Sequence, residues 1–79
     1  MRRKVYPVIA ARDLSAGDLV CRVCNRHGEP DGPQLNYTVR GLRYFAHDGN
    51  QFVTIQHGMQ DWEAMTINTD TLVQLEISP

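Results

Sequence analysis

The fold of this chain is decided by residues 35–56, which read LNYTVRGLRYFAHDGNQFVTIQ. The first part alternates apolar and polar residues, with apolar side chains at Leu35, Tyr37 and Val39. Alternation with a period of two is typical of a β-strand that has one buried face. Asp48-Gly49 predicts a tight turn, because this dipeptide accepts the positive φ angles that match the twist of paired strands. The segment therefore predicts a β-hairpin whose returning strand is 51–56.

Turn signals divide the rest of the chain into further short strands. We expect strands at 5–10, 19–23, 62–67 and 72–77, bounded by clusters of Gly, Pro, Asn and Asp. Pro7 favours an edge position for the first of them, because proline has no N–H to donate to a second neighbour. No window shows a sustained period of 3.6 residues, so no α-helix is predicted.

The connections between these strands differ in length. Gly17 is expected to turn the 13–18 segment with a positive φ. Residues 25–34 contain two Gly and two Pro and predict a long irregular loop. Asn68-Thr69-Asp70 predicts a short turn with one 3₁₀ step. In 19–23, alternation places Leu19, Cys21 and Val23 on one face.

Length and composition limit the class of protein. The chain has 79 residues, of which 42% are hydrophobic and 22% charged, which is ordinary for one small folded domain, 1–79. No stretch approaches the roughly 18 apolar residues of a membrane span. The apolar run after the basic start is interrupted by Pro7 and closed by Arg12-Asp13, so we expect no export signal and a cytoplasmic location. Residues 1–4 and 78–79 are expected to be mobile.

Two segments support a particular architecture. Residues 8–20 read VIAARDLSAGDLV and residues 65–73 read MTINTDTLV. The first resembles the entry of small SH3-like barrels, and the second is similar to their final strand, 3₁₀ turn and last strand. The resemblance implies an all-β fold, a small SH3-like barrel of five or six short strands. The chain also resembles uncharacterised small proteins of actinobacterial phages, which implies a phage or mobile-element protein that modulates a host partner.

Cys21, Cys24 and His27 form the one pattern that could hold a metal. A C-x₂-C turn points two thiolates at one ion, and His27, or the distant His47 or His57, could complete a zinc site. A second C-x₂-C is absent, however. The preferred interpretation is two free thiols without a metal, with Cys21 buried and Cys24 partly exposed.

Catalytic patterns are weak. Asp61 and Glu63 lie on one face if their segment is extended and could form an acid–base pair, but a solvated acidic edge is the commoner outcome. The chain has only two serines, Ser15 and Ser78, and no glycine-rich phosphate loop. We therefore expect no enzyme activity and no cofactor.

A nucleic-acid-binding barrel is an alternative. All eight Lys and Arg residues lie at or before Arg43, and aromatic residues are interleaved with them. Basic grooves with stacking aromatics bind single strands. The candidate residues are Arg22, Arg40, Arg43 and Tyr44. The net charge of −1 argues against a strong phosphate footprint. Tyr37 and Phe52 could instead fill the core, as aromatic residues at alternating spacing usually do.

The segment around Trp62 provides the preferred site. Trp62 stands between two carboxylates, and Met59 lies in the preceding turn. Trp62 fits either an interface or a lid over an undersized core. Trp anchors and adaptable Met side chains are favoured at binding surfaces. The sequence therefore favours a non-catalytic protein-binding module that uses Met59, Asp61, Trp62 and Glu63, and it leaves the oligomeric state open.

Overall fold

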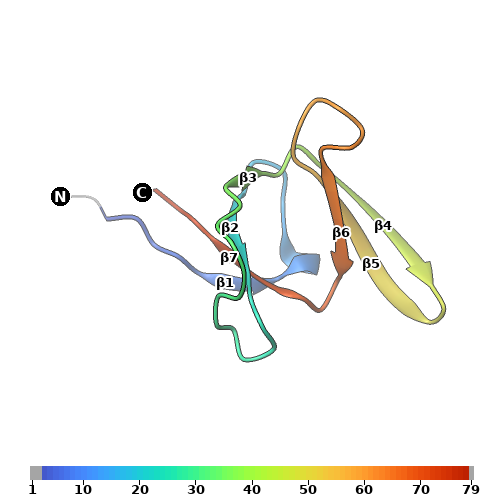
Figure 1. The fold of residues 1–79 in the computed structure, drawn as a ribbon, viewed down its shortest axis with the longest axis horizontal. Coiled ribbons are helices and arrows are strands. Elements are labelled where there is room, and N and C mark those ends of the chain that lie inside the picture. The colour runs from blue at the N-terminus through green and yellow to red at the C-terminus, as the bar shows by residue number, and fades with distance from the viewer. Residues whose placement is uncertain (1–2, 79) are drawn as a thin grey trace.

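The computed structural model describes residues 3–78, and its secondary structure is all β apart from one 3₁₀ turn, η1 (Figure 1). The elements are β1 (Val8–Ala10), η1 (Ala11–Asp13), β2 (Leu19–Val23), β3 (Tyr37–Thr38), β4 (Gly41–His47), β5 (Asn50–Gln56), β6 (Ala64–Asn68) and β7 (Leu72–Leu75). The all-β prediction is confirmed, with seven strands in the described residues where five or six were expected. The 3₁₀ turn follows β1, whereas the sequence suggested one at residues 68–70.

The strands form two antiparallel sheets that do not close into a barrel. One sheet has the order β1-β7-β2-β3 and the other has the order β4-β5-β6. The chain passes between them twice, at Val39-Arg40 and again between β6 and β7. At the first crossing, Val39 donates its N–H to Asp18 O on the side of the four-stranded sheet, and Arg40 donates its N–H to Gln56 O of the three-stranded sheet. Because each sheet keeps its own edge strands, the expected barrel is instead a pair of packed open sheets.

The predicted turn and returning strand are confirmed, but residues 35–39 do not belong to the hairpin, because β3 (Tyr37–Thr38) pairs with β2 in the other sheet and β4 begins only at Gly41. His47 pairs with Asn50, which leaves Asp48 and Gly49 as a two-residue loop between β4 and β5. Both loop residues have positive φ angles, 51° at Asp48 and 80° at Gly49. This is the geometry of a type I′ turn, whose twist matches that of the strands it joins. The expected positive φ at Gly17 is also found, at 97°.

A β-bulge in β2 overturns the expected alternation of that strand. Val20 pairs with Leu75 and Arg22 with Gln74, so Cys21 is an extra residue in the ladder. Such an insertion reverses the faces on either side of it. As a result Val20 is fully buried in the main core, and Val23 packs against the same core. The prediction that Leu19, Cys21 and Val23 share one face is therefore wrong.

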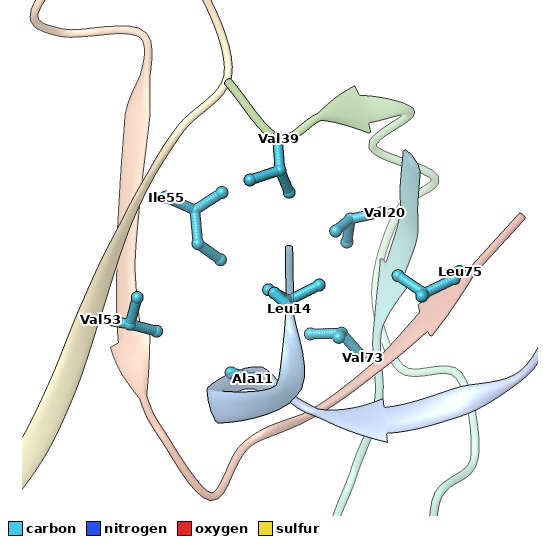
Figure 2. Packing of buried hydrophobic residues seen from close by; sticks show 8 residues of the cluster. All are labelled: Ala11, Leu14, Val20, Val39, Val53, Ile55, Val73 and Leu75. Carbon is cyan, nitrogen blue, oxygen red and sulfur yellow. The ribbon is translucent and has the colours of Figure 1, made fainter. Parts of the chain in front are cut away.

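The main core lies between the two sheets and is closed by the η1 segment (Figure 2). Its buried members are Ala11, Leu14, Val20, Val39, Val53, Ile55, Val73 and Leu75. Figure 2 shows the Leu14 side chain pointing inward among residues of both sheets. Burial of each aliphatic side chain stabilises the fold by roughly 1.5–3 kcal/mol. The two sheets therefore share one core and depend on each other.

Residues 25–34 form an ordered cover over the face of the four-stranded sheet that points away from the main core. Asn25 Oδ1 accepts hydrogen bonds from the backbone of His27 and Glu29, at 2.9 and 3.1 Å. A Cβ at Gly28 would lie 3.8 Å from Val8 Cγ1 and 3.9 Å from Leu72 Cδ1. The loop is irregular, as predicted, but its turns are fixed by local hydrogen bonds.

The two ends of the described chain run side by side. Val5 and Ile77 exchange two backbone hydrogen bonds of 2.9 Å, and Lys4 Nζ lies 3.5 Å from a carboxylate oxygen of Glu76. Of the ends expected to be mobile, residues 1, 2 and 79 lie outside the described residues. No helix in the described part has the length and apolar character needed to cross a membrane.

Candidate functional site

The residues singled out around Trp62 lie in one connection, residues 57–63, called here the β5–β6 loop. Trp62 is 78% exposed and Met59 is 81% exposed, the two highest values among the large hydrophobic side chains of the described chain. The alternative in which Trp62 covers the core is therefore wrong. The strand expected from residue 62 begins at Ala64 instead, so Trp62 belongs to the turn and not to the sheet.

The backbone of this loop is held by its own hydrogen bonds. Gln56 Nε2 donates to Gly58 O at 3.0 Å and to Gln60 O at 2.6 Å. The loop is closed at its base by His57 N–H donating to Glu63 O, and Glu63 N–H donates to Gln60 O, both at 2.9 Å. One side-chain amide thus ties two carbonyls of the turn to the end of β5.

Gly58 and Glu63 pack so closely that no other residue fits at position 58 without movement. A Cβ there would lie 2.6 Å from the Cβ of Glu63 and would also overlap its carboxyl group. Glu63 is half-buried in this packing, whereas Asp61 is exposed. Glu63 therefore contributes to the shape of the loop, and Asp61 is the freer of the two predicted acidic residues.

An aromatic stack joins the base of the loop to the other sheet. The rings of Tyr37, on β3, and His57 are nearly parallel at 7°, with centroids 3.7 Å apart. Arg40, in the connection between the sheets, places a guanidinium nitrogen 3.7 Å from Met59 Sδ. These contacts fix the loop relative to the domain. The exposed Trp62 is therefore presented by a preorganised backbone.

Beside the loop lies an open hollow of about 560 Å³ on the outer face of the three-stranded sheet. Its lining residues are Gly41, Leu42, Arg43, Thr54, Gln56, Asp61 and Ala64. Arg43 and Asp61 give it one charge of each sign. Thr54, in this lining, shares a hydroxyl–hydroxyl hydrogen bond of 2.9 Å with Thr66 on the neighbouring strand.

The outer face of the same sheet also carries an aromatic pair that the sequence interpretation assigned differently. Phe45 and Phe52 face each other in the register of β4 and β5, with ring centroids 5.5 Å apart and an angle of 22°. Val53 and Ile55 are fully buried, so alternation turns Phe52 to the opposite face. The core role considered for Phe52 is therefore wrong. Period-two parity was the signal that could have revealed this.

The residues of the nucleic-acid alternative do not share one surface. Arg22 donates to Gly32 O at 3.3 Å and so holds the 25–34 loop. Arg43 and Tyr44 are consecutive in β4 and point to opposite faces. The Tyr44 hydroxyl lies 3.5 Å from Arg12 O, on the core side. Arg40 lies beside Met59 instead.

Cys21 and Cys24 are free thiols that line different hollows, Cys21 near Tyr6 and Cys24 near Asp70. Both are buried, with 4% and 6% exposure, so the expected partial exposure of Cys24 is wrong. Burial raises the pKa of both thiols, and the negative charge of Glu76 adds to the effect at Cys21. Within residues 3–78 no three His, Cys, Asp or Glu side chains come together to hold a metal ion.

Comparison of the chain with models of protein families, with curated proteins and with solved structures gives no match. The candidate site is therefore defined by its own geometry. Gln56 and Gly58, which shape the loop, were not singled out in the sequence. Their roles depend on contacts within a turn whose conformation no short motif specifies.

Proposed function

We propose that this protein is a non-catalytic protein-binding module whose docking element is the β5–β6 loop. The observation that carries the proposal is the exposure of Trp62 on a backbone already fixed by Gln56 and Glu63. Exposing a large apolar side chain in a rigid loop has no benefit for folding, whereas a preorganised aromatic anchor lowers the entropic cost of binding.

The chemistry of the loop fits a partner with an apolar pocket and a basic rim. Trp62 would fill the pocket, and the flexible Met59 would adapt to its edge. Asp61 is exposed and would steer a basic surface toward the loop. A small phage or mobile-element protein that modulates a host protein would use such a surface, and the sequence resemblance supports that setting.

The test begins with three baits used in parallel on a host lysate: the wild type, Trp62→Ala and Phe45→Ala. Phe45 is 43% exposed on the sheet, so it controls for the loss of any exposed aromatic residue. The partner is the protein retained by the wild type and by Phe45→Ala and lost with Trp62→Ala. With that partner purified, Trp62→Ala should weaken binding by at least about 2 kcal/mol, or about 30-fold in Kd.

A second pair of variants tests steering. Asp61→Lys should lower the association rate and its dependence on salt, whereas Asp31→Lys, an exposed acidic residue of the 25–34 loop, should not. The proposal fails if Trp62→Ala unfolds the domain, or if no protein distinguishes it from Phe45→Ala. Binding of a single-stranded oligonucleotide that is lost on Arg40→Ala and Arg43→Ala, with Trp62 irrelevant, would replace it with the nucleic-acid alternative.

A further inference from the structure

The edge of β1 is unpaired. β1 is the first strand of the order β1-β7-β2-β3, and within residues 3–78 its only strand neighbour is β7. Natural sheets protect such edges with charged side chains, bulges or very short strands, because free backbone groups recruit other strands. β1 itself has only three residues, but backbone hydrogen bonds toward the β7 side extend from Val5 to Ala11, and this run contains no charged residue and no bulge.

Backbone hydrogen bonds define which residues of this segment point outward. Val5, Pro7 and Ala11 bond toward the β7 side: Val5 with Ile77, Pro7 O with Leu75 N–H, and Ala11 N–H with Thr71 O. Because strand residues alternate in direction, Tyr6, Val8 and Ala10 direct their N–H and C=O groups to the free edge. The one proline of the segment, Pro7, has its backbone directed toward β7, so its missing N–H leaves no gap on the free edge. The free edge therefore keeps both its N–H and its C=O groups at Tyr6, Val8 and Ala10.

The other sheet edges are less available. β3 has only two residues, and β4 carries the charged side chain of Arg43. On β6 the outward positions are Ala64, Thr66 and Asn68, because His57–Glu63 and Gln51–Thr69 mark the bonded pairs with the β5 side. The carbonyl of Asn68 already accepts from Thr71 N–H, which leaves two free positions. β1 is thus the edge best suited to add a strand.

We propose that β1 pairs antiparallel with β1 of a second copy of this chain, about a two-fold axis at Val8. In that register Tyr6 lies opposite Ala10 of the copy and Val8 opposite Val8, while on the other face Val5 lies opposite Ala11. Tyr6 thus meets the small Ala10, Val8 meets its own equivalent at the axis, and Ile9 lies opposite Pro7. The surface is self-complementary, as a two-fold interface requires.

Charge and exposed area favour the second copy as the occupant. At each end of the paired strands Lys4 would lie near Arg12 of the copy, but Lys4 is paired with Glu76 and Arg12 with Asp70, so the rim is neutral. Val5, Tyr6, Val8 and Ile77 are each 40–50% exposed. The chain exposes 5504 Å², whereas a compact monomer of 9.0 kDa exposes about 4,900 Å². The excess, about 600 Å², is somewhat less than one partner's share of a standard-size interface, about 800 Å².

The dimer would join the two four-stranded sheets into one continuous sheet. It would leave the β5–β6 loop of each copy free, because that loop lies on the other sheet (Figure 1). A partner with two matching sites would then bind with increased avidity. This inference stands apart from the proposed function, since its test needs no partner protein.

Sedimentation velocity tests the proposal, over concentrations from about 10 µM to about 1 mM, which span weak to moderate association. The wild type should approach twice its 9.0 kDa mass. Val8→Pro removes one outward N–H and no bond to β7, so it should sediment as a folded monomer. Thr66→Pro makes the same change on the β6 edge and should remain a dimer.

Val8→Lys provides a second variant that keeps every backbone donor. It places two ammonium groups beside each other at the axis and should therefore also give a monomer. If circular dichroism shows that Val8→Pro is unfolded, Val8→Lys is the variant that tests the dimer. Amide exchange of Tyr6, Val8 and Ala10 should slow as the wild type is concentrated, with Thr66 unchanged. A wild type that stays monomeric throughout, or a folded Val8→Lys protein that stays dimeric, would overturn the proposal.

Discussion

The three-stranded sheet joins strands that follow one another along the chain, whereas the four-stranded sheet pairs the last strand, β7, with β1 and β2 from the beginning of the chain. β4, β5 and β6 pair in sequence order, with no register shift in either ladder. In the other sheet β7 lies between β1 and β2, and β2 shifts register by a bulge. Local pairing is specified by turns, while distant pairing depends on how the core closes.

The two sheets nevertheless contribute to one core, and this limits how differently they can behave. Val53 and Ile55 come from the three-stranded sheet, called here the local sheet, and Val20 and Val73 come from the four-stranded sheet, called here the distant sheet. Neither sheet has a second layer of its own apart from the 25–34 cover. We therefore expect the two sheets to unfold in a single transition, although the pairing of their strands is specified in different ways.

The largest expected effect tests that shared core. Ile55→Ala removes a fully buried side chain of β5 and should lower the free energy of unfolding by about 3–4 kcal/mol, through lost burial and the cavity left behind. Urea unfolding measures the loss, and amide exchange should become faster in both sheets together. Faster exchange in the three-stranded sheet alone would mean that the two sheets unfold separately.

A smaller loss is expected from the two buried cysteines, Cys21 in β2 and Cys24 directly after it. Replacing both Cys21 and Cys24 by Ser should lower the free energy of unfolding by about 2–3 kcal/mol, because buried hydroxyl groups without partners replace small apolar groups. The matched control, Cys21→Ala with Cys24→Ala, should cost less. Equal losses in the two double variants would show that volume rather than polarity matters there.

The local turn gives the next test. Gly49→Val should cost about 1–3 kcal/mol, because a β-branched residue resists the φ of 80° at this position. Gly41→Val is the control, since Gly41 has no positive φ and a Cβ there would lie 3.9 Å from Gln56 Cβ, an ordinary contact. If both variants unfold at the same urea concentration, the turn does not set the register of β4 and β5.

The smallest effect is a pH dependence confined to the distant sheet. Burial raises the pKa of Cys21 and Cys24 in the folded state above the ordinary value of 9.0, so the unfolded chain releases these thiol protons first. The contribution to stability is complete below about pH 9 and is lost as pH rises through the folded-state pKa values. Urea unfolding between neutral and alkaline pH should give a steeper decline for the wild type than for the double Ala variant. Parallel declines would contradict the burial of the thiols.

Much of the local sheet could be predicted from residues alone. Asp48-Gly49 specifies its turn within four residues, and alternation at Val53 and Ile55 specifies its buried face. The candidate site could be predicted because Trp62 and Met59 are large apolar residues next to a turn. Their high exposure was not predictable, since it depends on Glu63 packing against Gly58 and on Tyr37 stacking on His57.

The sequence by itself determined that this protein is all β, that Asp48-Gly49 turns one strand back on the next, and that Val53 and Ile55 share a face of the returning strand. Those features follow from interactions over a few residues. The tertiary structure decided that the sheets stay open, that Cys21 forms a bulge and that β1 is left with a free edge. These features depend on pairing between the two ends of the chain, where packing around Val20 and Val73 outweighs the alternation of each strand.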